Sequence, residues 1–229
     1  MAVSKFHPVE QILEAYAAGQ RVFAESRPQE LAAKVPQLPA DVQWHFIGHL
    51  QTNKLKLVLP YVSLVQSVDS FHLLQAINTW ALANDRIVDV LLELHLGAEE
   101  TKQGFTEDEI LAISTAEENY FSQGFAKNQF SSANATPTLV SLKGVRIRGL
   151  MGMATNTDDM GVVERDFERI EALFRKIQAM GMPDFTELSI GMSGDWPLAV
   201  RHGATMVRIG TDIFGPRESC SAQKDCLSL

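Results

Sequence analysis

The chain has 229 residues, of which 45% are hydrophobic and 21% are charged, and its formal net charge is −8. This composition is typical of a soluble globular protein and excludes a disordered tail protein, a collagen-like fibre and a long coiled coil. The acidic balance disfavours broad binding to nucleic-acid backbones or anionic membranes.

The chain also lacks the signals of export. No apolar stretch approaches the ~18–20 residues of a membrane span, and the first residues do not have the pattern of a signal peptide. The two cysteines, Cys220 and Cys226, both lie near the C-terminal end. Two cysteines are too few for a disulfide framework or a zinc site. We therefore expect a reduced, cytoplasmic protein without a metal centre.

Short apolar runs alternate with helical patterns along the whole chain. The predicted strands cover residues 2–4, 21–24, 42–47, 61–68, 87–96, 145–150, 185–190 and 205–209. Helical spacing of apolar residues predicts helices over 8–19, after Pro28, 50–58, 70–83, 107–117, 158–180 and 195–202. Asp69-Ser70 is a plausible N-terminal cap for the helix that runs to Ala83.

Eight strands separated by helices predict an α/β fold, a single parallel (β/α)₈ barrel of the TIM type. The alternative is an open doubly wound sheet, which normally has a glycine-rich turn after its first strand; no such turn follows the first strand here. We expect one barrel domain over residues 1–217 and a flexible tail over 218–229. Within the domain, residues 122–143 are rich in polar and small residues and are interpreted as a surface insertion.

The active face of such a barrel lies where the strands end and the following loops begin. Lys5 follows the first predicted strand. Partial desolvation there would favour the neutral, nucleophilic amine, which can form a Schiff base with an aldehyde. The alternative is a surface lysine whose amine reaches water.

Glycine-rich loops follow the seventh and eighth predicted strands, with glycines at 191, 194, 210 and 215. Their backbone N–H groups can approach an anion, and Ser193 and Thr211 add hydroxyl groups. A phosphate site at these two loops recurs in barrels. Ordinary turn chemistry explains the glycines equally well.

Arg208 lies in an otherwise apolar run at the end of the eighth strand. A buried guanidinium needs a partner, because an unpaired buried charge is costly. A structural salt bridge to Glu93 or Glu187 is one interpretation of this residue.

Several long motifs resemble the YggS/PROSC family of pyridoxal phosphate (PLP) homeostasis proteins. The matching segments are Ala2-Val3-Ser4-Lys5, Trp44–Gly48 with Leu50–Lys54, Thr101–Phe105, Arg148–Met151, Leu188–Ser193 and Val207–Gly215. Several motifs in the right order are far more specific than one short motif. The resemblance covers the chain to about residue 217, except for the 122–143 region.

The resemblance implies a barrel like the N-terminal domain of bacterial alanine racemase, with pyridoxal 5′-phosphate held as a Schiff base on Lys5. It implies that the phosphate is bound by Ser193 and by the backbone of Gly210 and Thr211. It also implies that Arg208 faces the pyridine nitrogen and that His45 and Met153 line the ring pocket. Ser26, at the end of the second strand, completes the expected cofactor-binding set.

An arginine beside the ring nitrogen disfavours protonation of that nitrogen, because like charges repel. The electron sink of the cofactor is then weak, which suits a carrier better than an enzyme. We therefore expect a non-catalytic, monomeric protein that takes up, buffers and delivers PLP, with apo PLP-dependent enzymes as recipients. The alternatives are an amino-acid racemase of narrow scope and a structural or interaction protein that does not bind PLP.

Members of the resembled family carry a helix and most of the first strand ahead of the lysine motif, whereas Met1 lies four residues before Lys5. We therefore expect a barrel that lacks that helix and part of its first strand.

Overall fold

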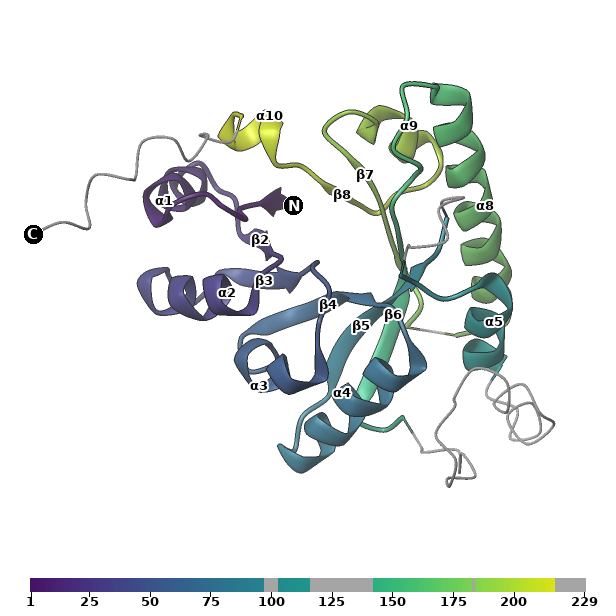
Figure 1. Cartoon of the computed structure of the whole chain (residues 1–229), viewed down its shortest axis with the longest axis horizontal. Helices are drawn as coiled ribbons and strands as arrows, with labels where there is room; N and C mark the ends of the chain where they lie inside the picture. The colour runs from purple at the N-terminus through teal and green to yellow at the C-terminus, as the bar shows by residue number, and fades with distance from the viewer. Residues whose placement is uncertain (97–102, 116–141, 183, 217–229) are drawn as a thin grey trace, which may run out of the picture.

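A computed structural model describes residues 1–96, 103–115, 142–182 and 184–216 of the chain. Eight parallel strands form one sheet in the order of the sequence, as Figure 1 shows. The strands are β1 (Ala2–Val3), β2 (Val22–Glu25), β3 (Gln43–Phe46), β4 (Val62–Val68), β5 (Val88–Leu94), β6 (Val145–Gly152), β7 (Glu187–Met192) and β8 (Met206–Arg208).

The two outer strands of this sheet meet through the residue that follows β8. The Val3 amide donates a hydrogen bond to the Ile209 carbonyl at 2.7 Å, and the Ile209 amide donates to the Met1 carbonyl at 3.1 Å. Ala2 and Ile209 also form a parallel bridge. This contact closes the sheet, so the predicted barrel is confirmed and the open doubly wound sheet is wrong.

Helices cover the outside of the barrel (Figure 1). The α-helices are α1 (Val9–Ala17), α2 (Pro28–Lys34), α3 (Leu55–Val58), α4 (Phe71–Ala83), α5 (Glu107–Thr115), α8 (Met160–Gln178), α9 (Trp196–Arg201) and α10 (Thr211–Phe214). Two 3₁₀ turns, η1 (Val35–Gln37) and η2 (Thr52–Lys54), precede β3 and α3. No described helix is long and apolar enough to cross a membrane.

Local signals explain where the principal helices begin. The Ser70 hydroxyl accepts a hydrogen bond from the Leu73 amide, which confirms the predicted cap of α4. The long helix α8 starts two residues later than predicted, because the Asp159 side chain caps it by accepting from the Gly161 amide. Its apolar stripe, which includes Phe167, Ile170 and Ile177, is buried against the barrel.

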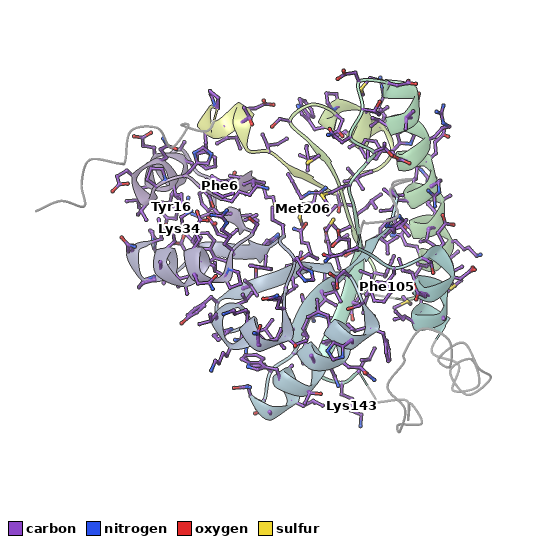
Figure 2. The ribbon with its side chains drawn as sticks, in the orientation of Figure 1. Phe6, Tyr16, Lys34, Phe105, Lys143 and Met206 are labelled. Carbon is purple, nitrogen blue, oxygen red and sulfur yellow. The ribbon has the colours of Figure 1, made fainter. Side chains whose placement is uncertain are left out.

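The apolar core lies mainly between the strands and the surrounding helices. Inside the barrel the apolar cluster is small, with Leu64, Leu91 and Met151 packed against Met206. Figure 2 labels Met206 within the ring of strands. The rest of the interior includes buried polar side chains, those of His45, Gln66, Ser189 and Arg208. This polar interior distinguishes the barrel from one filled by branched apolar side chains.

The structure departs from the predicted elements in a few places. The first strand has two residues rather than three, and the short helix α10 follows β8 where the sequence suggested only a loop. Most of the predicted insertion and all of the predicted tail, including Cys220 and Cys226, lie outside the described residues. The predicted insertion and tail therefore remain predictions.

Candidate functional site at the carboxyl ends of the strands

Loops from five strands carry the candidate residues to one end of the barrel. Lys5 and Ser26 follow β1 and β2, and Met153 follows β6. Ser193 follows β7, and Gly210-Thr211 follow β8. Because all eight strands are parallel, the loops that follow them lie at the same end, where barrel active sites are built.

Lys5 is half-buried and lies between two contacts that join the β1 loop to the β8 loop. On one side of Lys5, a Cβ atom placed on Gly210 would lie 3.5 Å from the Val3 carbonyl oxygen. On the other side, the His7 ring stacks on the Phe214 ring with 4.8 Å between centroids. Residues before and after Lys5 therefore join the loop that carries it to the segment from Gly210 to Phe214.

The loop that carries Ser193 is fixed against the end of β8. Met192 pairs with Arg208 in the sheet, so Ser193 begins the loop next to that arginine. The Met192 amide donates to the Asp195 carboxylate at 2.5 Å, which closes the turn. Gly191 has a φ of +91°, and a Cβ there would lie 2.5 Å from the Ala199 side chain. Glycine is thus required where α9 packs under this loop.

Arg208 is buried inside the barrel, where it contacts the middle of β7 and the carboxyl end of β6. Its Nη1 donates to the Ser189 carbonyl at 2.7 Å and to the Ser189 hydroxyl at 2.8 Å, and Nη2 donates to the Gly152 carbonyl at 2.8 Å. Burial lowers the pKa of Arg208 to about 10, and the negative charges of Glu93 and Asp195 oppose that shift. The guanidinium therefore remains charged at neutral pH and is held rigidly by neutral acceptors.

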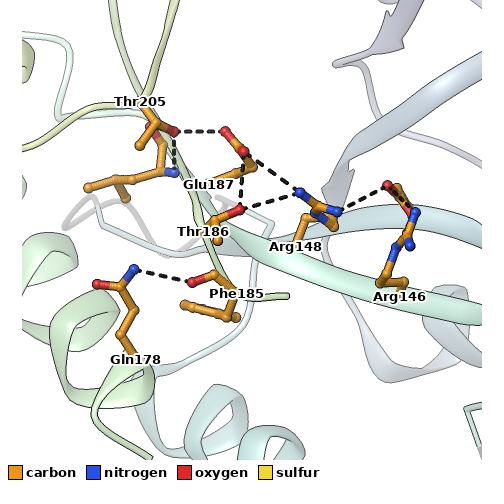
Figure 3. A network of polar contacts seen from close by, with 9 residues as sticks. Arg146, Arg148, Gln178, Phe185, Thr186, Glu187 and Thr205 are labelled. Atoms are coloured by element: carbon orange, nitrogen blue, oxygen red, sulfur yellow. Dashed lines mark hydrogen bonds and ion pairs between the residues drawn. The ribbon is translucent and has the colours of Figure 1, made fainter. Parts of the chain in front are cut away.

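The suggested salt bridge from Arg208 to Glu187 is wrong. Glu187 lies at the amino end of β7, where it accepts from Thr205 at 2.9 Å and lies 3.9 Å from Arg148 (Figure 3). Arg148 and Arg146 in turn lie near Asp89, at 3.8 and 2.7 Å. This network belongs to the opposite end of the barrel from the candidate site.

The suggested salt bridge from Arg208 to Glu93 is also wrong, because no described carboxylate lies within ion-pair distance of that guanidinium. Glu93 follows Leu91 by two residues on β5, so its side chain shares the inner face of the barrel. Burial, reinforced by the charge of Asp69, raises the pKa of Glu93 to about 7, and Arg208 and His49 oppose the rise. From the sequence, Glu93 was considered only as an ion-pair partner of Arg208, although its position in an apolar strand was a signal of a buried carboxyl.

His45 lies inside the barrel rather than in a loop at its rim. Its Nδ1 is 2.9 Å from the Gln66 side-chain nitrogen, and Gln66 accepts from the Ser189 hydroxyl at 2.7 Å. His45 lines a cavity of about 530 Å³ that Met1 and Asp89 also line, at the amino ends of the strands. Burial lowers the pKa of His45 to about 4, with a further contribution from the N-terminal ammonium. The structure thus connects His45 to Arg208 through Gln66 and Ser189 but separates it from the loops that carry Lys5 and Ser193.

Ser26 and Met153 lie on the rim with different surroundings. Ser26 packs against Gly48, where an added Cβ would lie 2.1 Å from the Ser26 carbonyl oxygen. The ends of β2 and β3 therefore approach closely. Met153 is 43% exposed, so its side chain is accessible at the mouth of the barrel.

Comparisons with known proteins show the family to which this chain belongs. Residues 1–218 match the family model described as "Alanine racemase, N-terminal domain". A pyridoxal phosphate homeostasis protein of Vibrio alginolyticus is 34% identical over 224 residues, which are 95% of this chain and 86% of the relative. The corresponding protein of Schizosaccharomyces pombe is 33% identical over 221 residues, which are 95% of this chain and 83% of the relative. The chain belongs to the family of pyridoxal phosphate homeostasis proteins.

Solved structures place this member of the pyridoxal phosphate homeostasis family near PipY of Synechococcus elongatus. PipY without PLP has a TM-score of 0.78 and 34% identity, covering 93% of this chain and 91% of PipY. PipY with PLP bound has a TM-score of 0.75 at the same identity, covering 94% of this chain and 91% of PipY.

An alanine racemase of Clostridium difficile has a TM-score of 0.69 at 15% identity. The match covers 98% of this chain but 54% of the racemase, so this likeness extends to the fold alone.

Proposed function

We propose that this protein binds pyridoxal 5′-phosphate at the carboxyl-end rim of its barrel and serves PLP homeostasis, by taking up, buffering and delivering the cofactor. The observation that carries the proposal is that the residues on both sides of Lys5 contact the segment after β8, because Val3 lies against Gly210 and His7 stacks on Phe214. The names of the relatives and the PLP-bound PipY structure support it.

The donor set at the rim fits the chemistry of this ligand. The Lys5 amine would attack the aldehyde carbon, so that a C=N bond replaces the C=O bond and the oxygen leaves as water. The Ser193 hydroxyl and the backbone N–H groups of Gly210 and Thr211 would donate to the phosphate. Glycine at 210 and the open space around Gly194 leave this backbone accessible.

Three further residues complete the proposed binding set. Ser26 and Met153 would border the ring from the rim. His45 would act from the barrel interior, through the hydrogen bonds that connect it to Arg208. PLP when bound supplies an electrophilic aldehyde, and these residues orient it.

Arg208 favours a carrier over an enzyme. We propose that its charge faces the pyridine nitrogen, where it would disfavour protonation of that nitrogen. The electron sink that PLP enzymes use is then weakened. The guanidinium has three hydrogen bonds to Ser189 and Gly152, so it is held in place as a fixed positive charge.

Absorbance titration tests the proposed lysine. Mixing the purified protein with PLP should give a band near the edge of the visible range, and borohydride should fix the cofactor on Lys5. Lys5→Ala should lose the reducible adduct, whereas the exposed-lysine control Lys56→Ala should retain it. An adduct that survives in Lys5→Ala contradicts the assignment.

Proton exchange tests the carrier interpretation against a racemase of narrow scope. We expect no exchange of the α-proton when the PLP-loaded protein is incubated with a panel of amino acids in deuterated water. If the protein exchanges the α-proton of any of these amino acids and Lys5→Ala does not, the protein is an enzyme rather than a carrier.

We also propose a cytoplasmic location, a monomeric state and apo PLP-dependent enzymes as recipients. Fractionation, sedimentation and transfer of PLP to an apo-enzyme test these three.

A further inference from the structure

A buried lysine from α2 lies beneath the loop that carries Lys5. The side chain of Lys34 is 8% exposed. Its Nζ donates to the Ser4 carbonyl at 2.8 Å and to the carboxylates of Glu25 and Glu30, each at 2.7 Å. These bonds use all three donors of the ammonium group. Figure 2 shows Lys34 close to Phe6, at the side of the barrel covered by α1 and α2.

This cluster holds the residues on both sides of Lys5. Ser4 donates its hydroxyl to Glu25 Oε1 at 2.6 Å, and its carbonyl accepts from Lys34. Phe6 donates its amide to Glu30 Oε1 at 2.7 Å. Lys5 is therefore flanked by two residues whose backbones are fixed by the same ammonium–carboxylate cluster.

The backbone at Phe6 shows that this loop is constrained. Phe6 has a φ of 70°, a conformation that a non-glycine residue rarely adopts and that costs of order 1–3 kcal/mol. The Arg27 guanidinium covers the Phe6 ring at 4.4 Å, and Glu30 holds its amide. Such strain persists only where the surroundings determine the conformation, and residues of this kind concentrate at functional sites.

Stability alone does not account for the cluster. Buried ion pairs are often replaced by apolar side chains without loss, because desolvation offsets the attraction between charges. One oxygen of the cluster, Glu25 Oε2, is buried and has no hydrogen-bond partner among the described residues. Burial raises the pKa of the Glu25 carboxyl, and the hydrogen bond from Lys34 only partly opposes this rise. The cluster therefore retains a free-energy cost of desolvation that its hydrogen bonds do not fully offset.

We infer that Lys34, together with Glu25 and Glu30, is a positioning device that fixes the β1–α1 loop so that Lys5 presents its amine to the aldehyde of PLP. The inference rests on the proposed function, because Lys5 is the residue that it positions. Lys34 itself remains engaged by its three acceptors and does not react.

A pair of variants at Glu30 tests this device without opening the core. The Glu30 side chain is 20% exposed. Glu30→Ala removes the acceptor of the Phe6 amide, whereas the amide oxygen of Glu30→Gln can still accept from it. We expect Glu30→Ala to weaken PLP binding roughly three- to tenfold, in line with the net loss of one ordinary hydrogen bond that holds the loop. Glu30→Gln should restore affinity to within about twofold of the parent. Equal affinity of Glu30→Ala and the parent overturns the inference.

Lys34→Met, with Lys176→Met on α8 as the exposed matched control, provides the second test. Borohydride trapping followed by peptide mass mapping measures the rate at which Lys5 is labelled by PLP. We expect this rate to fall severalfold in Lys34→Met molecules that remain folded by circular dichroism, and to be unchanged in Lys176→Met. A lower thermal midpoint with an unchanged labelling rate means a structural role only and overturns the inference. If Lys34→Met does not fold, the Glu30 pair decides.

The parent protein separates the two possible failures. If the parent forms no borohydride-stable adduct on Lys5, the proposed function fails and the positioning role fails with it. If the parent labels at Lys5 and the Glu30 and Lys34 variants label equally fast, the positioning role alone fails.

Discussion

Arg208 donates from a single nitrogen, Nη1, to both the carbonyl oxygen and the hydroxyl of Ser189, at 2.7 and 2.8 Å. Ser189 is fully buried on β7 and passes its own hydroxyl hydrogen to Gln66 at 2.7 Å. Gln66 is in turn 2.9 Å from the His45 ring nitrogen. One buried serine thus connects the cationic end of the barrel interior to the histidine at its other end.

Replacing Ser189 with alanine should therefore disturb both ends of this chain. Ser189→Ala removes the hydroxyl that accepts from Arg208 and donates to Gln66, and should reduce the free energy of unfolding by about 2 kcal/mol. Urea unfolding measures that loss, and PLP titration should show a severalfold weaker affinity.

Ser114→Ala is the control for this effect. Ser114 is also buried, but its hydroxyl donates only to Ile110 one turn earlier in α5. We expect it to change stability by less than about 0.5 kcal/mol and PLP affinity not at all. Equal effects of the two substitutions would contradict the role of Ser189.

His45 should make the protein less stable in acid. Its folded-state pKa is about 4, below the ordinary value of 6.5, so the unfolded chain binds more protons between these values. The stability that depends on neutral His45 is complete above pH 6.5 and is lost as the pH falls toward 4. His45→Asn should remove roughly 2–3 kcal/mol of this pH dependence, as measured by urea unfolding across the window. The same change at the exposed His72 should leave the slope intact.

Glu93 should have the opposite effect to His45, because it should make the protein less stable as the pH rises. Its folded-state pKa is raised from 4.5 to about 7, so the folded protein holds the proton more tightly than the unfolded chain. The resulting stability is complete below pH 4.5 and is lost as the pH rises through 7. Glu93→Gln should raise the free energy of unfolding at pH 8 by on the order of 2 kcal/mol. The exposed control Glu14→Gln should not, and an unchanged pH profile in Glu93→Gln would contradict the burial of this carboxyl.

Gly48 should tolerate no side chain. A Cβ at this position would lie 2.1 Å from the Ser26 carbonyl oxygen, which is backbone and cannot rotate away. Gly48→Ala should cost about 3 kcal/mol of unfolding free energy, because the ends of β2 and β3 must separate. At Gly194 an added Cβ meets no atom within 4 Å, so Gly194→Ala should stay within about 0.5 kcal/mol of the parent. Thermal and urea unfolding of the two variants provide the comparison.

Local pattern predicted much of this fold. The run Ile87–Leu96 contains the buried strand β5, and the apolar stripe of residues 158–180 contains the buried face of α8. The Ser70 cap was also predictable, because it consists of one local hydrogen bond between the serine hydroxyl and the amide three residues later. The helix α10 was not, since its four residues carry no helical period.

The candidate site was predictable to the extent that it follows strand ends. Lys5, Ser193 and Gly210 were selected because they follow apolar runs. The barrel closure between β8 and β1 then places Val3, two residues before Lys5, against Gly210. The acceptors of Arg208 were not predictable, because two are main-chain carbonyls and the third is a serine 19 residues away. Every residue has a main-chain carbonyl group, so the sequence does not indicate which carbonyl accepts from a given side chain.

The sequence by itself determined the alternation of strands and helices, the barrel and the residues at the ends of its strands, because hydrophobic period and turn residues act over a few neighbouring positions. Only the tertiary structure decided which polar groups meet. Lys34 reaches Ser4 across 30 residues, and Ser189 reaches Gln66 across 123. Such contacts depend on the register of strands around a closed barrel, a property of the whole chain that no local segment encodes.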